Sequence, residues 1–188
     1  TYEVINPATE EVIGHASKAS PVDVDKALKS AEKGLEIWKK TSPWKRSLII
    51  RKIADKIREK QDIIAKWLTL EVGKPLAEGK AEAGATADIF EWNSEETKRI
   101  YGQTVESRFE DTRIHVYYQP IGVVAAMVPW NFPLVLAARK ISTALAAGCS
   151  VICKPDVIAP GGVMQLVDIC KEAGVPPGVV NLLSGDPP

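Results

Sequence analysis

The chain has 188 residues, of which 45% are hydrophobic, so it can bury a sizeable core of about one domain. Lysine plus arginine and aspartate plus glutamate both number 24, so bulk charge favours neither nucleic acid nor an anionic membrane surface. The longest apolar run is too short to span a bilayer, and the first residues do not read as a secretory leader. We expect a cytoplasmic protein, or one of an organelle matrix after processing, with neither nucleic acid nor a membrane as partner.

The amino-terminal half is predicted to be mostly helical. Serine-proline pairs open two helices, and apolar residues spaced three and four apart give each helix one buried stripe. Gly73 ends the second helix, and a longer, more polar helix follows it. The predicted helices cover residues 20–38, 43–72 without a break, and 76–100.

Two antiparallel strand pairs are expected on either side of these helices. The first is a hairpin or an edge pair around an Asn-Pro turn. The second alternates polar with apolar residues and forms an exposed hairpin whose edge is open to another chain. The pairs comprise residues 2–5 with 11–16, and 103–108 with 113–119.

The carboxyl-terminal third predicts a parallel sheet. The run 122–128 is apolar, uncharged and largely β-branched, which suits a strand buried on both faces. Two further apolar stretches follow, each after a helix that ends at a glycine, so the order of elements is βαβαβ. The later elements are helix 134–147, strand 150–153, helix 162–173 and strand 179–183. The fold class is therefore α/β, a partial Rossmann-like parallel sheet with amino-terminal helices and an inserted β-hairpin.

The turn after the first of these strands is the main candidate site. It presents Trp130, Asn131 and Phe132 at the carboxyl end of a strand, where ligands of open α/β sheets bind. Pro133 stands in the first helical turn, where its missing N–H costs nothing. Asn131 also suits a helix cap, and the residue pattern alone supports both roles.

The three cysteines, Cys149, Cys153 and Cys170, lie inside apolar segments without metal-ligand spacing. We expect reduced, buried thiols with raised pKa values and no metal site. The chain begins with Thr1 and ends with Pro188 soon after a predicted strand, so we expect that both ends are cut.

Several spaced motifs occur together along the chain. They read NPAT (6–9), EVGKPL (71–76), VPWNFP (128–133), AAGC (146–149), KP (154–155) and VPPGVVN (175–181). In this order they resemble the amino-terminal region of an NAD(P)-dependent aldehyde dehydrogenase over the whole chain. The letters EW (91–92), EE (95–96) and KRIYG (98–102) especially resemble the succinate-semialdehyde dehydrogenase branch.

The resemblance implies a specific chemistry. In this family a cysteine thiolate adds to the aldehyde, the alkoxide gives hydride to the nicotinamide, and a glutamate-activated water hydrolyses the thioester. Asn131 matches the family's side-chain donor to that oxyanion. The family's cysteine and glutamate lie downstream of residue 188, so the resemblance implies an amino-terminal fragment of an enzyme, inactive alone. The alternative is a non-catalytic nucleotide-binding or assembly module.

The resemblance also implies an NADP or NAD site at the ends of two strands. Lys154 matches a family lysine that binds the adenosine ribose, although a solvated strand-end lysine is the plainer alternative. Val157 stands where many members have a glutamate that binds the ribose hydroxyls, and Asp156 restores that carboxylate only if it turns inward. The choice between NAD and NADP therefore stays open. The implied cofactor-binding residues are Val128, Pro129, Trp130, Lys154, Pro155, Asp156 and Val157.

Arg139 matches the arginine that binds the distal carboxylate of the substrate in the succinate-semialdehyde branch. An ion pair between helices is the alternative for this residue. The resemblance implies a semialdehyde as substrate and a homodimer or homotetramer held together by the hairpin. It divides the chain into helical residues 1–102 of the cofactor domain, an oligomerisation hairpin at 103–120, and the first βαβαβ half of the cofactor sheet at 121–188.

Overall fold

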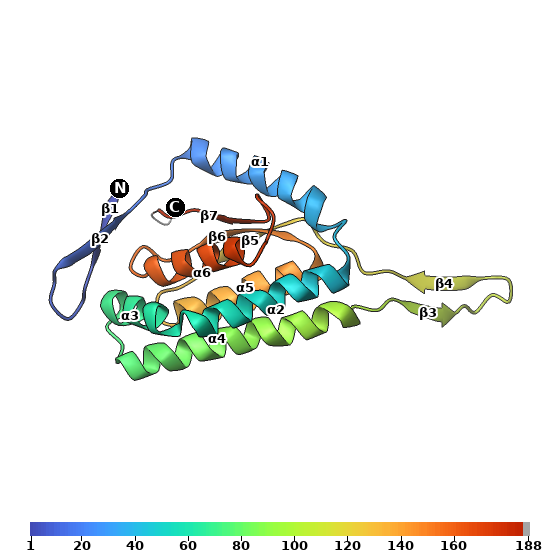
Figure 1. Cartoon of the computed structure of the whole chain (residues 1–188). Coiled ribbons are helices and arrows are strands. Elements are labelled where there is room, and N and C mark those ends of the chain that lie inside the picture. Colours follow the sequence, from blue (N-terminus) through green and yellow to red (C-terminus); the bar gives the residue numbers. More distant parts are fainter. Residues whose placement is uncertain (186–188) are drawn as a thin grey trace.

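A computed structural model describes residues 1–185, so the last three residues of the predicted 121–188 segment lie outside the described residues. Helices and strands follow one another along the chain as Figure 1 shows. The elements are β1 (Tyr2–Ile5), β2 (Val12–Ala16), α1 (Pro21–Trp38), α2 (Pro43–Glu59), α3 (Gln61–Val72), α4 (Leu76–Glu96), the 3-10 helix η1 (Thr97–Arg99), β3 (Gln103–Glu106), β4 (Arg113–Val116), β5 (Val123–Met127), α5 (Pro133–Ala147), β6 (Ser150–Lys154), α6 (Gly161–Glu172) and β7 (Val180–Leu182).

The parallel sheet has the strand order β5-β6-β7. Val123 pairs with Ser150 and Met127 with Lys154, while Val151 pairs with Val180. Helix α1 lies on one side of this sheet, and the remaining helices lie on the other side (Figure 1). The predicted α/β class with a partial parallel sheet is confirmed.

A hydrophobic core joins the sheet to the helices. Trp38 at the end of α1 is fully buried, and its indole N–H donates to the Leu145 carbonyl at 2.9 Å. Helix α1 also approaches the loop before β7 closely, since a Cβ on Gly34 would lie 2.2 Å from the Gly178 carbonyl carbon. Gly178 itself has a φ of 83°, which a glycine adopts without strain. These contacts fix α1 against the sheet.

The prediction of one unbroken helix over 43–72 is wrong. The helix breaks at Lys60, whose φ of −100° and ψ of 11° leave the helical region. No glycine or proline marks this position in the sequence. The Lys60 ammonium contacts Glu172 at the end of α6 at 2.6 Å, and α3 packs on α4 and α6 after the break. Tertiary packing therefore decided the bend.

The prediction that the first parallel strand is buried on both faces is also wrong. In β5, Ala126 is buried, whereas Met127 is 58% exposed. Helix α5 packs on the face that carries Ala126, and α1 crosses the opposite face mainly over β6 and β7. The face of β5 that carries Met127 is therefore open in this chain.

The hairpin of β3 and β4 projects away from the helices as an arm (Figure 1). Its antiparallel register runs from Gln103 with Val116 to Glu106 with Arg113, so the strands are shorter than predicted. Nearly all of its strand residues are exposed. Among the helices of residues 1–185, none combines the apolar character and the length needed to cross a bilayer.

Candidate functional site

The carboxyl ends of β5 and β6 meet at one edge of the sheet. The Val128 N–H donates to the Lys154 carbonyl at 3.0 Å, which extends the ladder by one step. The structure thus brings together the two strand ends that the sequence predicted as a cofactor site. Of the other predicted residues there, Trp130 is 49% exposed, while Pro155 is buried.

Asn131 follows this edge in the turn that leads into α5. The helix has Phe132 at its N-cap, without a side-chain capping bond. Within residues 1–185, the side-chain amide of Asn131 makes no hydrogen bond, so the capping role is not the one it has in this structure. The amide is therefore available to a ligand.

The first amides of α5 are satisfied by a residue from a distant helix. Glu82 on α4 accepts the Leu134 N–H at 2.9 Å and the Val135 N–H at 3.4 Å through one carboxylate oxygen. A carboxylate at a helix N-terminus is favoured because it pairs free N–H groups and meets the positive end of the helix dipole. The sequence analysis missed Glu82, and no local motif marks it.

Lys74, in the loop between α3 and α4, completes this arrangement. Its ammonium pairs with the second oxygen of Glu82 and donates to the Asn131 carbonyl at 3.1 Å. It also lies 4.5 Å from the centroid of the Phe132 ring, a distance that gives a cation–π contact. The Lys74 and Glu82 side chains are 8% and 1% exposed. Lys74 belongs to the EVGKPL motif, but its partners could not be read from the sequence.

A cavity of about 650 Å³ lies between α4 and α5 beside this turn. Asn131 and Arg139 both line it, together with Glu78 of α4 and the apolar side chains of Val135 and Leu136. Its volume is within the range of small-molecule sites. The structure therefore brings the predicted oxyanion donor and the predicted carboxylate-binding arginine to one cavity.

Arg139 is exposed on α5 at this cavity. Of the carboxylates in residues 1–185, none lies within ion-pair distance of its guanidinium, so the alternative of an ion pair between helices is not observed among them. A guanidinium has five donors in a planar fork that matches a carboxylate. An anionic ligand group in the cavity could bind it.

A second, smaller groove of about 260 Å³ lies beside Lys154. Its walls are mainly apolar and come from the open face of the sheet, from α1 and from the chain after β7. They include Val24, Met127, Ile152 and Leu183. Asp156 does not line this groove, and its carboxylate accepts the Ile158 N–H at 3.1 Å in a local turn.

A second buried carboxylate caps α6. Glu71 accepts the N–H groups of Gly161 and Gly162 at 2.6 and 2.8 Å. Burial raises the pKa of Glu71 to about 7, although the two backbone hydrogen bonds act in the opposite direction. The sequence analysis missed this capping role too. Both helices that follow the sheet strands are therefore capped by glutamates from the amino-terminal helices.

The predicted burial of the three thiols is confirmed. All three cysteines are buried and free. Burial raises the pKa of Cys153 to about 12 and that of Cys170 further, so neither is a thiolate near neutral pH.

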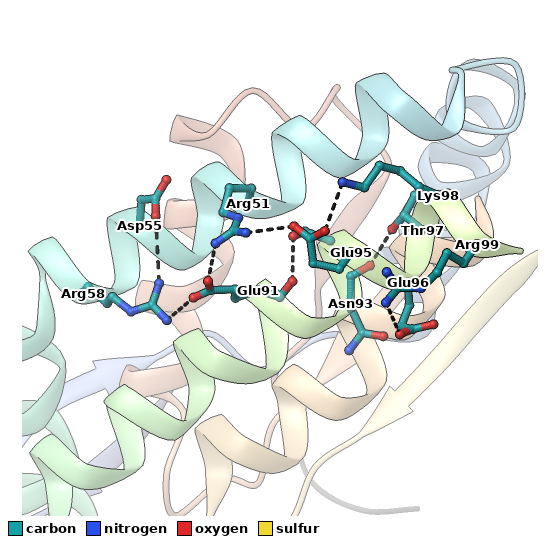
Figure 2. A network of polar contacts seen from close by, with 11 residues as sticks. Arg51, Asp55, Arg58, Glu91, Asn93, Glu95, Glu96, Thr97, Lys98 and Arg99 are labelled. Carbon is teal, nitrogen blue, oxygen red and sulfur yellow. Dashed lines mark hydrogen bonds and ion pairs between the residues drawn. The ribbon is translucent and has the colours of Figure 1, made fainter.

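Glu91 of the EW motif and Glu95 of the EE motif bind α4 to α2 (Figure 2). Glu96 pairs with Arg99 of η1 instead. Arg51 pairs with Glu91 and, at 2.8 Å, with Glu95, while Arg58 pairs with Glu91 and, at 2.8 Å, with Asp88. None of these five side chains lines the cavity at Asn131. Their observed role is to hold two helices together at the surface.

Comparison with known proteins identifies related sequences and structures. The model of the aldehyde dehydrogenase family matches residues 1–188. A glutarate-semialdehyde dehydrogenase of Pseudomonas putida is 42% identical over 98% of this chain and 38% of its own length. A succinate-semialdehyde dehydrogenase (NADP(+)) of Escherichia coli is 40% identical over 97% of this chain and 38% of its own length.

The fold is also found in solved structures. Betaine aldehyde dehydrogenase from Staphylococcus aureus, crystallised in complex with NAD+, superposes with a TM-score of 0.95 at 33% identity. The match covers 98% of this chain and 37% of that one. This chain thus spans about two fifths of the length of the relatives that it matches.

Proposed function

The chain belongs to the aldehyde dehydrogenase family, and we propose that the full-length protein oxidises an aldehyde to the carboxylic acid with NAD or NADP. The observation that carries this proposal is the cavity of about 650 Å³ that Asn131 and Arg139 share. The nucleophile and the general base would come from outside these 188 residues, so we expect the chain alone to show no turnover. The activity belongs to the full-length protein.

Asn131 would stabilise the oxyanion. When the nucleophile adds to the aldehyde carbon, the carbonyl π electrons move to oxygen, and that alkoxide needs a donor already in place. The Asn131 side-chain N–H is suited to this because no protein group in the described chain competes for it. The alkoxide then re-forms the carbonyl and releases the hydride, and hydrolysis of the resulting thioester yields the acid.

The cofactor would lie at the joined ends of β5 and β6. When bound, NAD or NADP accepts the hydride. The mainly apolar groove beside Lys154 fits a nucleoside, and the lysine cation fits a ribose hydroxyl or a ribose phosphate. Val128, Pro129 and Trp130 from one strand end, and Pro155, Asp156 and Val157 from the other, would complete the site. Val157 is apolar, and the Asp156 carboxylate accepts the Ile158 N–H in an Asx turn, so we expect only weak repulsion of a 2′-phosphate and keep both NAD and NADP as candidates.

Arg139 would select the substrate. An unpaired guanidinium in the same cavity as Asn131 suits an aldehyde with a carboxylate at its other end, such as succinate semialdehyde. Relatives named succinate- and glutarate-semialdehyde dehydrogenases support this class of substrate.

The exposed hairpin of β3 and β4 would join subunits. A two-stranded hairpin alone is marginally stable in water, so an arm of this kind gains stability when another chain covers it. We propose a homodimer or homotetramer, with residues 103–120 as the oligomerisation hairpin between the helical segment 1–102 and the cofactor sheet 121–188.

Steady-state kinetics on the full-length protein tests the proposal. Asn131→Ala should lower kcat by about two to three orders of magnitude, the usual loss for one oxyanion donor, with little change in cofactor affinity. Arg139→Ala should lower kcat/KM for succinate semialdehyde roughly tenfold to a hundredfold more than for an uncharged aldehyde of similar length. An unchanged kcat for Asn131→Ala would remove the oxyanion role, and equal losses on both aldehydes would remove the carboxylate-bearing substrate.

A further inference from the structure

We propose that Lys74 and Glu82 form a buried clamp that positions Asn131 for oxyanion binding. Glu82 belongs to the wall of the cavity, but its side chain is 1% exposed and its two oxygens are bound by the Leu134 N–H and by Lys74. We therefore treat Lys74 and Glu82 as positioning residues that act through Asn131. The inference rests on the proposed oxyanion role of Asn131 and adds the device that keeps its amide available. The experiments below separate a failure of the clamp from a failure of that role.

The clamp holds the backbone that directly follows the Asn131 side chain, at two places. Lys74 donates to the Asn131 carbonyl at 3.1 Å and covers the Phe132 ring at 4.5 Å. Glu82 holds the next amides, those of Leu134 and Val135, at 2.9 and 3.4 Å. Because the ammonium and the carboxylate also pair with each other, the carbonyl before the helix and the N–H groups that open it are fixed to one ion pair.

The clamp also explains why the side-chain amide of Asn131 does not cap α5. Asparagine close to a helix start commonly accepts the free N–H groups of the first turn. In this turn Glu82 accepts them, over a separation of 52 residues along the chain, and the N-cap is Phe132. The Asn131 side chain is therefore free to line the cavity.

An apolar pair could not replace the clamp. Both side chains are more than nine-tenths buried. Burying an ion pair costs desolvation that the mutual attraction often only offsets, and an apolar pair of similar size is commonly as stable. An apolar pair cannot donate to the Asn131 carbonyl or accept two amides, however. The turn needs both of these functions, and the ion pair supplies them.

A loose turn should impair catalysis more than binding. Oxyanion stabilisation depends on donors that need no reorganisation during the reaction, and a displacement of about 1 Å can lower a rate about a hundredfold. In the full-length protein we expect Lys74→Met to lower kcat roughly tenfold to a hundredfold, with KM for the cofactor unchanged. Lys74→Arg retains a cation and should recover some of the loss.

Removal of Lys74 alone leaves the Glu82 carboxylate buried without its partner, which endangers folding. The double variant Lys74→Met/Glu82→Gln avoids that charge, and it should show the same loss of kcat. The matched control is Lys80→Met, which removes a lysine on α4 whose 2.7 Å pair with Asp62 is exposed. This control should leave kcat unchanged.

A double-mutant cycle decides whether the clamp acts through Asn131. If it does, Lys74→Met should cost little further kcat in an Asn131→Ala background, whereas independent residues give additive losses. Additive losses, or full kcat in Lys74→Met while Asn131→Ala is impaired, would overturn the clamp. Wild-type kcat in Asn131→Ala itself would instead overturn the oxyanion role, and the clamp's contribution to catalysis with it.

Hydrogen exchange on the 188-residue chain gives a readout that needs no activity. In Lys74→Met/Glu82→Met, which also removes the acceptor of these amides, exchange at the Leu134 and Val135 amides should accelerate at least tenfold, while amides in β6 keep their rates. Lys80→Met should change none of these rates. Unchanged protection of Leu134 in the double variant would show that the turn is held without the clamp and would overturn the proposal.

Discussion

The ion pairs that α4 makes on its α2 side and on its α5 side differ in nearly every physical respect. On the α2 side, Arg51 and Arg58 share Glu91 (Figure 2). Arg51 also pairs with Glu95 and Arg58 with Asp88, and all of these side chains are 36% exposed or more. On the α5 side, Lys74 and Glu82 form one pair that is almost completely buried. Exposed pairs are screened by water and salt, whereas a buried charge must keep every partner. We therefore expect that removing one residue of the exposed network changes the free energy of unfolding little, whereas removing one residue of the buried pair lowers it strongly.

Exposed and buried carboxyl groups of this chain also differ in their pKa. Hydrogen bonds from Arg58 and then Arg51 lower the pKa of the exposed Glu91. Burial raises the pKa of Glu71, which caps α6, to about 7. Solvated cations thus favour the charged form of one glutamate, while exclusion of water favours the neutral form of the other.

The largest effect on stability should come from the buried pair. Glu82→Ala leaves the Lys74 ammonium buried without a counter-charge and the Leu134 N–H without its acceptor. We expect a loss of about 3 to 5 kcal/mol in the free energy of unfolding, measured by urea denaturation of the 188-residue chain. Asp62→Ala, which removes the exposed partner of Lys80, is the control and should cause almost no change. Equal losses in both variants would remove the distinction between buried and exposed pairs.

The second largest effect is the pH dependence of stability that Glu71 causes. Because the folded pKa of Glu71 lies above its ordinary value of 4.5, the folded chain binds the extra proton, and the associated stability is present below about pH 4.5. It is lost as the pH rises to about 7, and the loss should be about 3 kcal/mol. Denaturation of wild type and Glu71→Gln between pH 4.5 and 8 measures it, since the variant should lack this dependence.

Glu91→Gln sharpens this test because the pKa of Glu91 is shifted in the opposite direction to that of Glu71. A lowered folded pKa gives stability that is present above the ordinary value of 4.5 and is lost as the pH falls. Relative to wild type, Glu91→Gln should therefore lose stability at neutral pH and not at acid pH. If the stability of both variants relative to wild type changed with pH in the same direction, burial would not explain the difference between Glu71 and Glu91.

The smallest effect should come from a single member of the exposed network. Arg58→Met removes pairs with Glu91 and Asp88, but the side chain is 40% exposed and its partners keep their water. We expect a loss below about 1 kcal/mol that shrinks further in 1 M NaCl. Urea denaturation at low and high salt measures both quantities. If Arg58→Met lost as much free energy of unfolding as Glu82→Ala, exposed and buried ion pairs would not differ in their contribution to stability.

Local patterns in the sequence predicted most of the fold. The Ser20-Pro21 start signal forms a capping box with Asp23 in α1, and the glycine at 148 ends α5 in the left-handed conformation. The apolar runs near β5, β6 and β7 predicted parallel strands because buried strands need little polar alternation. Each of these signals depends on residues that are neighbours along the chain.

The place of Asn131 follows from local sequence alone, because a strand that stops before Pro129 and a helix that begins at Pro133 leave Asn131 in the turn between them. The contacts that hold this turn, in contrast, depend on how distant segments pack together. Glu82 reaches α5 over 52 residues and Glu71 reaches α6 over 90, and such partners have no local pattern. Burial turns these distant carboxylates into helix caps, because an N–H group away from water must find an acceptor wherever the fold provides one.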